Sequence, residues 1–223
     1  MIENKSNTSS HWIDVSIPFR EGMVVSRNDI KVKIERRSSI ELGARANTSA
    51  IHMGVHVGTH MDSPRHVFVN GKSIDQMPLD IGIGPARVLE ISDSEAIKPE
   101  ELKQWNIKRG ERILFKTRNS LKRWQNDTFE GGEYVYITRD AAHLLVDLDV
   151  KLIGIDYLTV GGLQEMHKEG PDTHQILLGA EIWLLEGLDL SGVSAGKYDL
   201  ICLPLKFVQT DGSPVRAVLR PIP

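Results

Sequence analysis

The chain has 223 residues, of which 40% are hydrophobic and 26% charged, a composition that argues against disorder and against a coiled coil. Its formal net charge of -3 provides no broad basic surface for nucleic acid, whose binding needs clustered Lys and Arg to neutralise phosphates. One hydrophobic core can still fill a chain of this length, so we expect a single domain over residues 1–223.

Eight segments have the short, apolar or β-branched composition of strands. In chain order they are residues 12–17, 50–57, 86–91, 112–117, 151–157, 182–187, 199–205 and 215–222. Three segments have helical character: residues 99–105, residues 139–147 and residues 174–180. Pro99 suits the first turn of the first helix, and Thr138 can cap the second. Strands outnumber helices, so we predict a mixed α/β domain in which irregular loops join the sheets.

The single cysteine, Cys202, rules out an intrachain disulfide and a thiolate-only metal site, and it fits a cytoplasmic location. It lies in an apolar strand, which favours a buried, inert thiol. The opening segment MIENKSNTSSHW lacks the apolar run of a signal peptide. The most apolar stretch, ILLGAEIWLLEGL, contains Glu181 and Glu186, which would be costly in lipid. We therefore expect no membrane partner and no nucleic acid, but a small-molecule substrate.

Histidines are concentrated in one short segment of the chain. His52, His56, His60 and His66 lie within fifteen residues, and Asp62 is among them. Imidazole and carboxylate together form the ligand set of zinc, manganese and iron sites. The structural alternative is a glycine-rich, half-buried strand whose histidines merely alternate with apolar residues.

The spacing of these residues restricts the backbone between them. In a helix, His56 and His60 would share a face but Asp62 would point away. In a straight strand, His56 and His60 would lie about 13 Å apart at roughly 3.3 Å per residue, too far for one ion. We therefore expect a strand that ends in a tight bend at Gly58 and Thr59, where glycine permits a sharp turn.

The residues on either side of this cluster have different expected roles. Ser63 and Pro64 divert the chain again, because proline donates no backbone hydrogen bond and restricts the residue before it. This second bend allows His66 to return towards the site. His52 precedes the cluster, and we expect it to pack or to face the substrate rather than to bind metal.

A second cluster lies in HKEGPDTHQILLGAEIWLLEGLDL. His174 opens a predicted helix and Glu186 stands near the end of a predicted strand, so both side chains could face one cavity. Spacing alone does not distinguish them from His167, Glu165 or Glu181. Asp156, at the end of the predicted strand 151–157, is equally suited to support the site or to stabilise a turn.

The segment HVGTHMDSPRH, residues 56–66, resembles the HxGTHxDxPxH signature of the cyclase-like metal-dependent hydrolases, the family of bacterial kynurenine formamidases and isatin hydrolases. Every fixed position of the signature is filled. IDVSIPF is similar to the opening strand of the family, LIGIDYLTV to its central strand, and HQILLGAEIWLLEGLDL to its closing ligand segment. The resemblance implies a barrel-like α/β/α cyclase-like domain with many short strands, assembled as a homodimer or homotetramer.

The resemblance also implies roles for individual residues. The implied metal ligands are His56, His60, Asp62, His174 and Glu186. The first three hold one ion, and the last two, twelve residues apart, hold a second ion jointly with Asp62. The final histidine of the signature, His66, is implied as an acid or base. Imidazole and carboxylate suit both zinc and manganese, so we expect one or two divalent ions of either kind.

These residues predict hydrolysis by water that a divalent ion has activated, with His66 transferring the proton. The predicted reaction is cleavage of a C–N bond in a small formamide or cyclic amide, as in an arylformamidase. One alternative is a hydrolase of a lactone or another ester. A second alternative is a metal-binding protein without catalysis, although such a protein has no need of His66. The substrate stays open, because EGMVVSRNDI stands where kynurenine formamidases often carry Trp-Pro-Gly-Asp.

Overall fold

The computed structural model describes residues 11–26, 29–122, 134–163 and 170–222. Most of the polar opening segment lies outside these ranges, as do Glu165 and His167, so the expectations for them stay untested. No helix in the described ranges is long and apolar enough to cross a bilayer.

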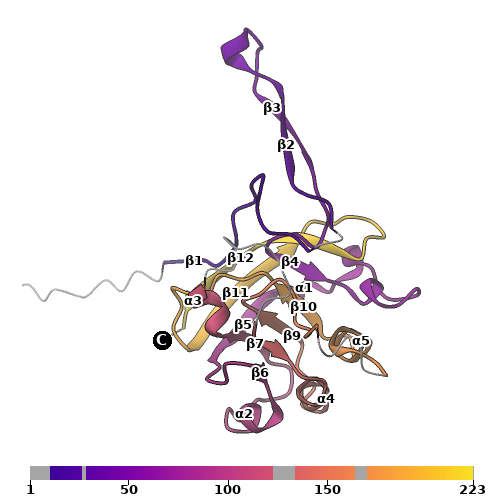
Figure 1. The fold of residues 1–223 in the computed structure, drawn as a ribbon, viewed down its shortest axis with the longest axis vertical. Coiled ribbons are helices and arrows are strands. Elements are labelled where there is room, and N and C mark those ends of the chain that lie inside the picture. The colour runs from indigo at the N-terminus through magenta and orange to yellow at the C-terminus, as the bar shows by residue number, and fades with distance from the viewer. Residues whose placement is uncertain (1–10, 27–28, 123–133, 164–169, 223) are drawn as a thin grey trace, which may run out of the picture.

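Seven strands close into a barrel at the centre of the molecule (Figure 1). Their bounds are β4 (His60–Asp62), β5 (Ile83–Glu90), β7 (Arg112–Lys116), β9 (Leu152–Ile155), β10 (Trp183–Glu186), β11 (Gly196–Pro204) and β12 (Gly212–Pro221). The order around the barrel is β12-β11-β5-β7-β9-β10-β4, and β4 pairs back onto β12. β5, β7, β9 and β10 are mutually parallel, and the other barrel pairings are antiparallel. The short strand β1 (Ile13–Asp14) pairs with β12. The predicted mixed α/β barrel is confirmed.

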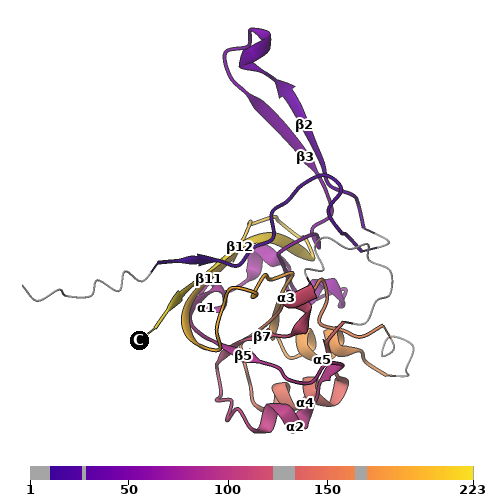
Figure 2. The ribbon, with the colours of Figure 1, turned by 60° about the vertical axis from the view of Figure 1, so that its left-hand side comes forward.

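Helices and a small second pair of strands lie outside the barrel. The helices are α1 (Leu79–Gly82), α2 (Pro99–Lys103), α3 (Arg118–Lys122), α4 (Arg139–Asp147) and α5 (Thr173–Gly179), with 3-10 turns η1 (Ile40–Leu42), η2 (Pro64–His66) and η3 (Ile74–Gln76). The strands β6 (Ala96–Ile97) and β8 (Tyr136–Ile137) pair in parallel. As predicted, the Thr138 side chain caps α4, where it accepts a hydrogen bond from the Ala141 amide. Figure 2 shows α2, α4 and α5 on one side of the barrel.

The strands β7, β9 and β10 are buried on both faces, so neighbouring residues along them belong to different cores. Leu114 packs inside the barrel with Trp183 and Cys202. Ile113 and Phe115, on either side of Leu114, pack outside it against the helices. Burying one such side chain contributes roughly 1.5–3 kcal/mol. Burial also raises the pKa of the Cys202 thiol to about 12, which agrees with the inert thiol expected from the sequence.

A hairpin stands away from the barrel (Figures 1 and 2). It consists of β2 (Lys33–Ser38) and β3 (Thr48–His52), and we call residues 33–52 the arm. The predicted strand 50–57 was wrong in its second half, because β3 ends at His52 and a turn follows. The sequence pattern did not predict β2, whose KIERRS is largely charged and has no buried face.

Candidate metal centre

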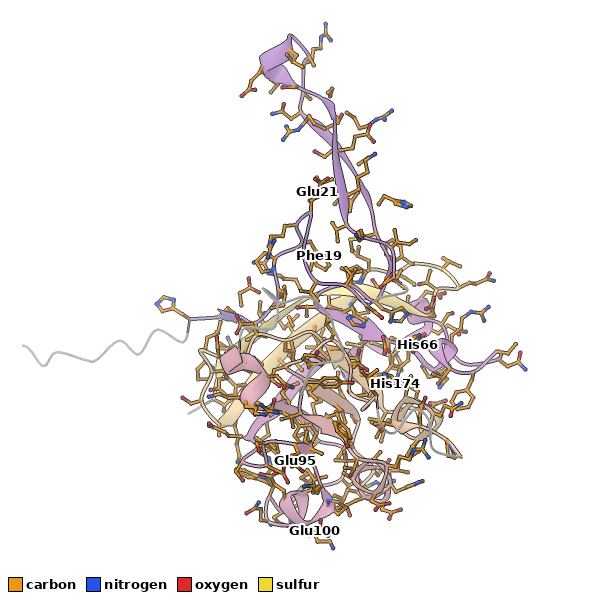
Figure 3. The ribbon with its side chains drawn as sticks, viewed as in Figure 1. Phe19, Glu21, His66, Glu95, Glu100 and His174 are labelled. Atoms are coloured by element: carbon orange, nitrogen blue, oxygen red, sulfur yellow. The ribbon has the colours of Figure 1, made fainter. Side chains whose placement is uncertain are left out.

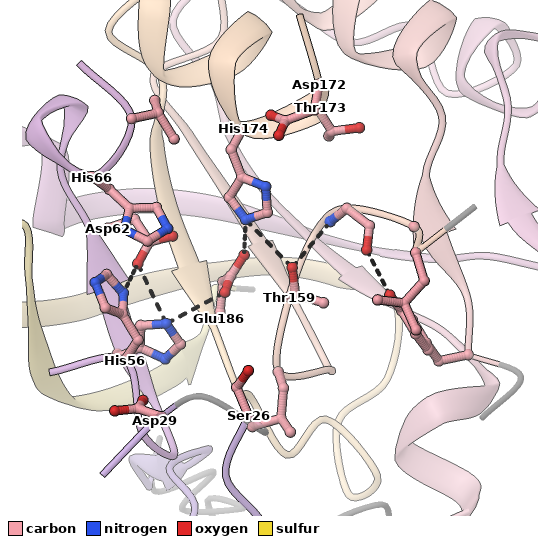
Figure 4. Close-up of a pocket in the computed structure, with 17 residues that line it drawn as sticks. Ser26, Asp29, His56, Asp62, His66, Thr159, Asp172, Thr173, His174 and Glu186 are labelled. Carbon is pink, nitrogen blue, oxygen red and sulfur yellow. Dashed lines mark hydrogen bonds and ion pairs between the residues drawn. The ribbon is translucent and has the colours of Figure 1, made fainter. Parts of the chain in front are cut away.

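All six residues predicted for the site face one pocket of about 600 Å³ beside the barrel. They are His56, His60, Asp62, His66, His174 and Glu186. Figure 3 shows His66 and His174 facing the same region from different elements, and Figure 4 shows the pocket at close range. The structure therefore brings the two sequence clusters together.

Strand pairing places the innermost three side chains. His60 and Asp62 are two residues apart in β4, so they share one face, and Met61 between them points into the barrel core. In the antiparallel register of β4 and β10, Glu186 lies opposite His60. Cross-strand neighbours of this kind have close Cβ atoms. A carboxylate and an imidazole from distant parts of the sequence are thus forced together.

The predicted bend lies where the sequence placed it, at Gly58 and Thr59, but it precedes the strand instead of ending one. Gly58 has a φ of +62°, a conformation that side chains other than glycine disfavour, and a Cβ there would meet the Phe19 ring at 2.9 Å. The Thr59 hydroxyl donates to the Gly187 carbonyl at 2.5 Å and accepts from the Ile17 amide at 2.8 Å. These contacts fix the turn that carries His56 against the start of β4.

His60 is oriented as a metal-binding imidazole would be. Its Nδ1 lies 3.0 Å from the Gly58 carbonyl oxygen, which leaves Nε2 to face the carboxylates. Nε2 is 3.3 Å from Asp62 Oδ1 and 3.3 Å from Glu186 Oε2. Donor atoms about 2.0–2.2 Å from a tetrahedral ion are separated by about 3.3 Å. His60 Nε2 therefore lies at a ligand-to-ligand distance from each carboxylate, and His56, His60 and Asp62 together form a cluster that could hold one ion.

His56 approaches the same carboxylate from the turn. Its Nδ1 lies 2.7 Å from Asp62 Oδ1, and its Nε2 lies 2.5 Å from Asp211 Oδ2. Burial alone would lower the pKa of His56, but Asp62 and Asp211 outweigh it and raise that pKa to about 9. The charge of His56 in turn helps to hold the pKa of Asp62 well below its usual value, although burial opposes this. The neighbouring imidazoles thus favour the ionised form of Asp62.

Asp211 is a site residue that sequence reasoning missed. It lies in QTDGSP, before β12, and reads as an ordinary turn residue. The pairing of Gly212 with Asp62 across β12 and β4 brings it to the site. The hydrogen bond from His56 lowers the pKa of Asp211 to about 2. The only feature of the sequence that could have pointed to Asp211 is the glycine that follows it. A Cβ at Gly212 would come within 2.7 Å of the His56 ring.

His174 and Glu186 form the second part of the site. His174 is the second residue of α5, and its Nε2 lies 3.3 Å from Glu186 Oε1. Glu186 ends β10, and its Oε1 also accepts a hydrogen bond from the Val160 amide at 2.7 Å. Asp172 and Gln175 form the capping box that starts α5 and thereby places His174. The predicted meeting of a helix start and a strand end in one cavity is confirmed.

One atom of the pocket indicates that a cation would fit among these donors. Asp62 Oδ2 is buried and has no hydrogen-bond partner in the part of the chain that the structure describes. A buried carboxylate oxygen without a partner is costly, and a cation would satisfy it. The imidazoles and carboxylates around it suit zinc or manganese. On these observations the residues present fit a divalent ion.

His66 lies at the outer side of the site, at the end of η2. Its ring centroid is 4.1 Å from that of His56 and 5.8 Å from that of His174. Its Nδ1 is 3.7 Å from Asp211 Oδ2. As expected, the chain diverted at Pro64 returns His66 to the pocket, next to the proposed ligands.

Two further candidates do not line the pocket. His52 is exposed on the arm, so the expectation that it packs was wrong. Asp156 is buried, and its carboxylate accepts hydrogen bonds from the amides of Thr117 and Ser120 at 2.8 and 3.1 Å. These bonds fix the start of α3, so Asp156 has the local structural role that the sequence left open.

The remaining pocket wall is largely apolar. Val67, Leu158 and Leu163 line it, together with the ring of Tyr134, which stacks on Tyr157 with centroids 4.0 Å apart. The stretch EGMVVSRNDI contributes polar groups of Ser26 and Asp29 to the wall, which Figure 4 shows across the pocket from His174. The pocket thus combines an apolar wall with a cluster of imidazoles and carboxylates.

Four imidazoles and two buried carboxylates around a pocket beside a closed barrel define a metal-dependent hydrolase. Residues 13–161 match the family model described as putative cyclase. The chain is 34% identical over 215 residues to a kynurenine formamidase of Bacillus cereus, covering 96% of this chain and 99% of that one. The chain belongs to the putative cyclase family.

Solved structures agree with this assignment. One, described as a potential metal-dependent hydrolase with cyclase activity, is 33% identical, has a TM-score of 0.80, and is matched over 96% of this chain and 99% of its own. Isatin hydrolase A from Labrenzia aggregata has a TM-score of 0.83 at 24% identity, covering 95% of this chain and 93% of that chain. At that identity the second likeness shows the fold.

Proposed function

We propose that this chain hydrolyses the C–N bond of a small formamide or cyclic amide, as an arylformamidase does. The observation that carries the proposal is the convergence of His60, Asp62 and Glu186. His60 Nε2 lies 3.3 Å from one carboxylate oxygen of each of the other two, and the second oxygen of Asp62 is buried without a partner among the described residues. The 34% identity to a kynurenine formamidase over nearly the whole chain supports a formamide as substrate.

We assign the first ion to His56, His60 and Asp62. His56 would bind through Nδ1 and His60 through Nε2, since the opposite nitrogen of each ring faces an oxygen acceptor. The ion is zinc or manganese, both of which this donor set suits. When bound, a divalent ion lowers the pKa of a water molecule and polarises the carbonyl to be cleaved.

We assign a second ion to His174 and Glu186, shared with Asp62. The 3.3 Å separation of His174 Nε2 and Glu186 Oε1 supports this assignment, as does the unpartnered Oδ2 of Asp62. Two-metal hydrolases use such a pair of sites to hold both the attacking and the departing groups. The proposed content is therefore two ions per chain.

His66 is the residue that we expect to move the proton. It lies among the proposed ligands yet on the open side of the pocket, where water and a leaving nitrogen can reach its ring. Histidine is the side chain that most often serves as general acid or base. We propose that His66 accepts a proton from the attacking water and donates one to the departing nitrogen.

The apolar wall supports an aromatic or similarly flat substrate. The Tyr134 hydroxyl donates to the Gly161 carbonyl at 2.8 Å, and the Tyr134 ring stacks on Tyr157. Leu158 and Leu163 extend this surface. A flat ring against this wall would leave its formamide or lactam group towards the imidazoles. Assembly as a homodimer or homotetramer and a cytoplasmic location complete the proposal, the latter supported by the single, buried cysteine.

A substrate panel measured with the metal-loaded enzyme tests the reaction class. The panel contains an aryl formamide, an alkyl formamide, an isatin-type lactam, an aromatic lactone and an aryl ester. We expect kcat/KM to be highest for the aryl formamide or the lactam. A tenfold preference for the lactone or ester would establish the alternative bond class. Metal binding without hydrolysis of any panel member would instead indicate a non-catalytic protein.

A further inference from the structure

One carboxylate of the pocket wall has no part in the proposed metal centre. Within the described ranges, the acidic residues that line the pocket are Asp29, Asp62, Asp172 and Glu186. Asp62 and Glu186 are proposed ligands. Asp172 caps α5, where its side chain accepts a hydrogen bond from the Gln175 amide at 2.9 Å. Of these four residues, Asp29 is left without a role in metal binding or helix capping.

Asp29 is held in place by backbone groups next to it in the chain. Its amide donates to the Ser26 carbonyl at 3.0 Å and so closes a turn. Its Oδ1 accepts a hydrogen bond from the Ile30 amide at 2.7 Å, which fixes the carboxylate. Its Oδ2 accepts no hydrogen bond from the described residues. One oxygen of this half-buried carboxylate is therefore free for a ligand.

Gly54 makes room for the Asp29 carboxylate. A Cβ at Gly54 would lie 1.7 Å from Asp29 Oδ1 and 2.8 Å from Oδ2. Every residue other than glycine has a Cβ, so any of them at this position would displace the carboxylate. Gly54 follows the end of β3 by two residues, and Asp29 precedes β2 by four. The two ends of the arm therefore meet at this contact and hold Asp29 in the pocket wall.

The charges of the pocket favour a cation beside Asp29 over an anion. No lysine or arginine among the described residues lines the pocket, and its imidazoles belong to the proposed metal centre. A substrate carboxylate next to Asp29 would thus meet a like charge without a compensating one. An ammonium group would instead pair with Oδ2, since it has donors only. Charge complementarity of this kind decides which of two similar ligands a site accepts.

The size and lining of the pocket leave room for such a group. Its volume of about 600 Å³ lies in the range of pockets that hold drug-sized ligands, so it exceeds what a bare formamide needs. Tyr134, Leu158 and Leu163 form the apolar wall, and Figure 4 shows Asp29 across the pocket from His174. A substrate with its amide at the imidazoles and its ring against this wall can carry a further group towards Asp29.

We propose that Asp29 determines specificity by binding an ammonium group of the substrate through Oδ2. The assignment rests on the proposed function, which places the amide to be cleaved at the metal centre. The substrate class is then an aryl formamide or cyclic amide whose ring carries a protonated amine. Analogues with a carboxylate in place of the amine are disfavoured.

Matched formanilides measured with the metal-loaded full chain test this selection. They carry an aminomethyl, a hydroxymethyl or a carboxylate group on the ring, meta or para to the formamide. We expect the wild-type kcat/KM to favour the aminomethyl over the hydroxymethyl compound by about tenfold or more, less at high salt, and the carboxylate to be poorest. Asp29→Asn should bring the ratio of the first two to about one. Asp147→Asn, at an exposed aspartate that ends α4, should keep the wild-type ratio.

Gly54→Ala tests the same contact without removing the charge, because the new methyl group displaces the Asp29 carboxylate. We expect it to lower the ratio as Asp29→Asn does. Gly192→Ala is the matched control, because a Cβ there has no atom within 4 Å, and it should keep the ratio.

Calorimetric binding of phenylureas that carry the same three groups gives a measurement that does not depend on hydrolysis. We expect the same order of affinities, again lost in Asp29→Asn. An ammonium preference in binding without hydrolysis of any formamide would support the role of Asp29 and count against the proposed function alone. Equal or tighter binding of the carboxylate compound by the wild-type protein, or an unchanged ratio in Asp29→Asn, would overturn the proposal.

Discussion

The inner and outer halves of the pocket are built differently. The side chains of His60, Asp62 and Glu186 are only 1–3% exposed, and all three residues lie in barrel strands. Those of His56, His66 and Asp211 are 22–46% exposed, and turns or loops carry them. The inner half is fixed by strand register, whereas turns and a loop outside the strand ladder position the outer half. We therefore expect the inner residues to dominate metal content, and His66, which is not a proposed ligand, to control turnover from the outer half.

Asp62→Asn is the strongest test of the inner half. Asp62 faces the imidazoles of His56 and His60. It is also the proposed ligand shared by two ions, so both ions depend on its negative charge. We expect loss of bound metal and a fall in kcat/KM of about a thousandfold or more. Elemental analysis and turnover of the purified variant check this. Normal metal content in Asp62→Asn would show that another group provides the central charge.

Glu186→Gln tests the second proposed ion separately from the first. The amide keeps the size of the side chain but removes the charge that faces His60 and His174. We expect metal content to fall from two ions per chain to one, with about a hundredfold loss of turnover. The matched control is Glu181→Gln, whose carboxylate is exposed and pairs with Lys72. Wild-type protein that binds one ion at saturation, with Glu186→Gln unchanged in content, would refute the binuclear site.

His66→Ala tests whether the outer half serves turnover. We expect the variant to keep most of its metal and to lose about a hundredfold or more in kcat, the usual scale for removal of a general acid or base. His143→Ala, at an exposed histidine of α4, is the control. Near-normal turnover across the pH range would remove the proton-transfer role. Loss of metal would make His66 a ligand.

Asp211→Asn should have the smallest effect. The residue does not face the carboxylates, but it holds His56 Nε2 at 2.5 Å and so fixes the ring. Partners of metal-binding histidines affect affinity or activity by about 10- to 100-fold when they are replaced. We expect metal affinity to fall within that range, measured by competition with a chromophoric chelator. Unchanged affinity would show that the turn alone positions His56.

The two halves also differ in how far the sequence could predict them. The cluster from His56 to Asp62 is local, so excluding a helix and a straight strand was enough to predict the bend at Gly58. The partnership of His174 with Glu186 needed the resemblance, because spacing alone did not separate them from Glu181. Asp211 could not be found, since only the closure of β12 onto β4 brings it to His56.

The same difference holds for the fold. Strands with two buried faces, such as β7 and β9, have continuous apolar runs, and each of their ends was predicted to within two residues. β2 has no buried face within one chain, so its charged sequence gave no strand signal. A strand without a buried face therefore gives no apolar pattern from which it could be predicted.

Removal and return of metal test the central claim most directly. The enzyme is stripped with a strong chelator, and zinc or manganese is titrated back while aryl formamide hydrolysis and metal content are measured on the same samples. We predict no hydrolysis without metal and recovery that is complete at two ions per chain. Full activity in protein shown by elemental analysis to be metal-free would contradict the account.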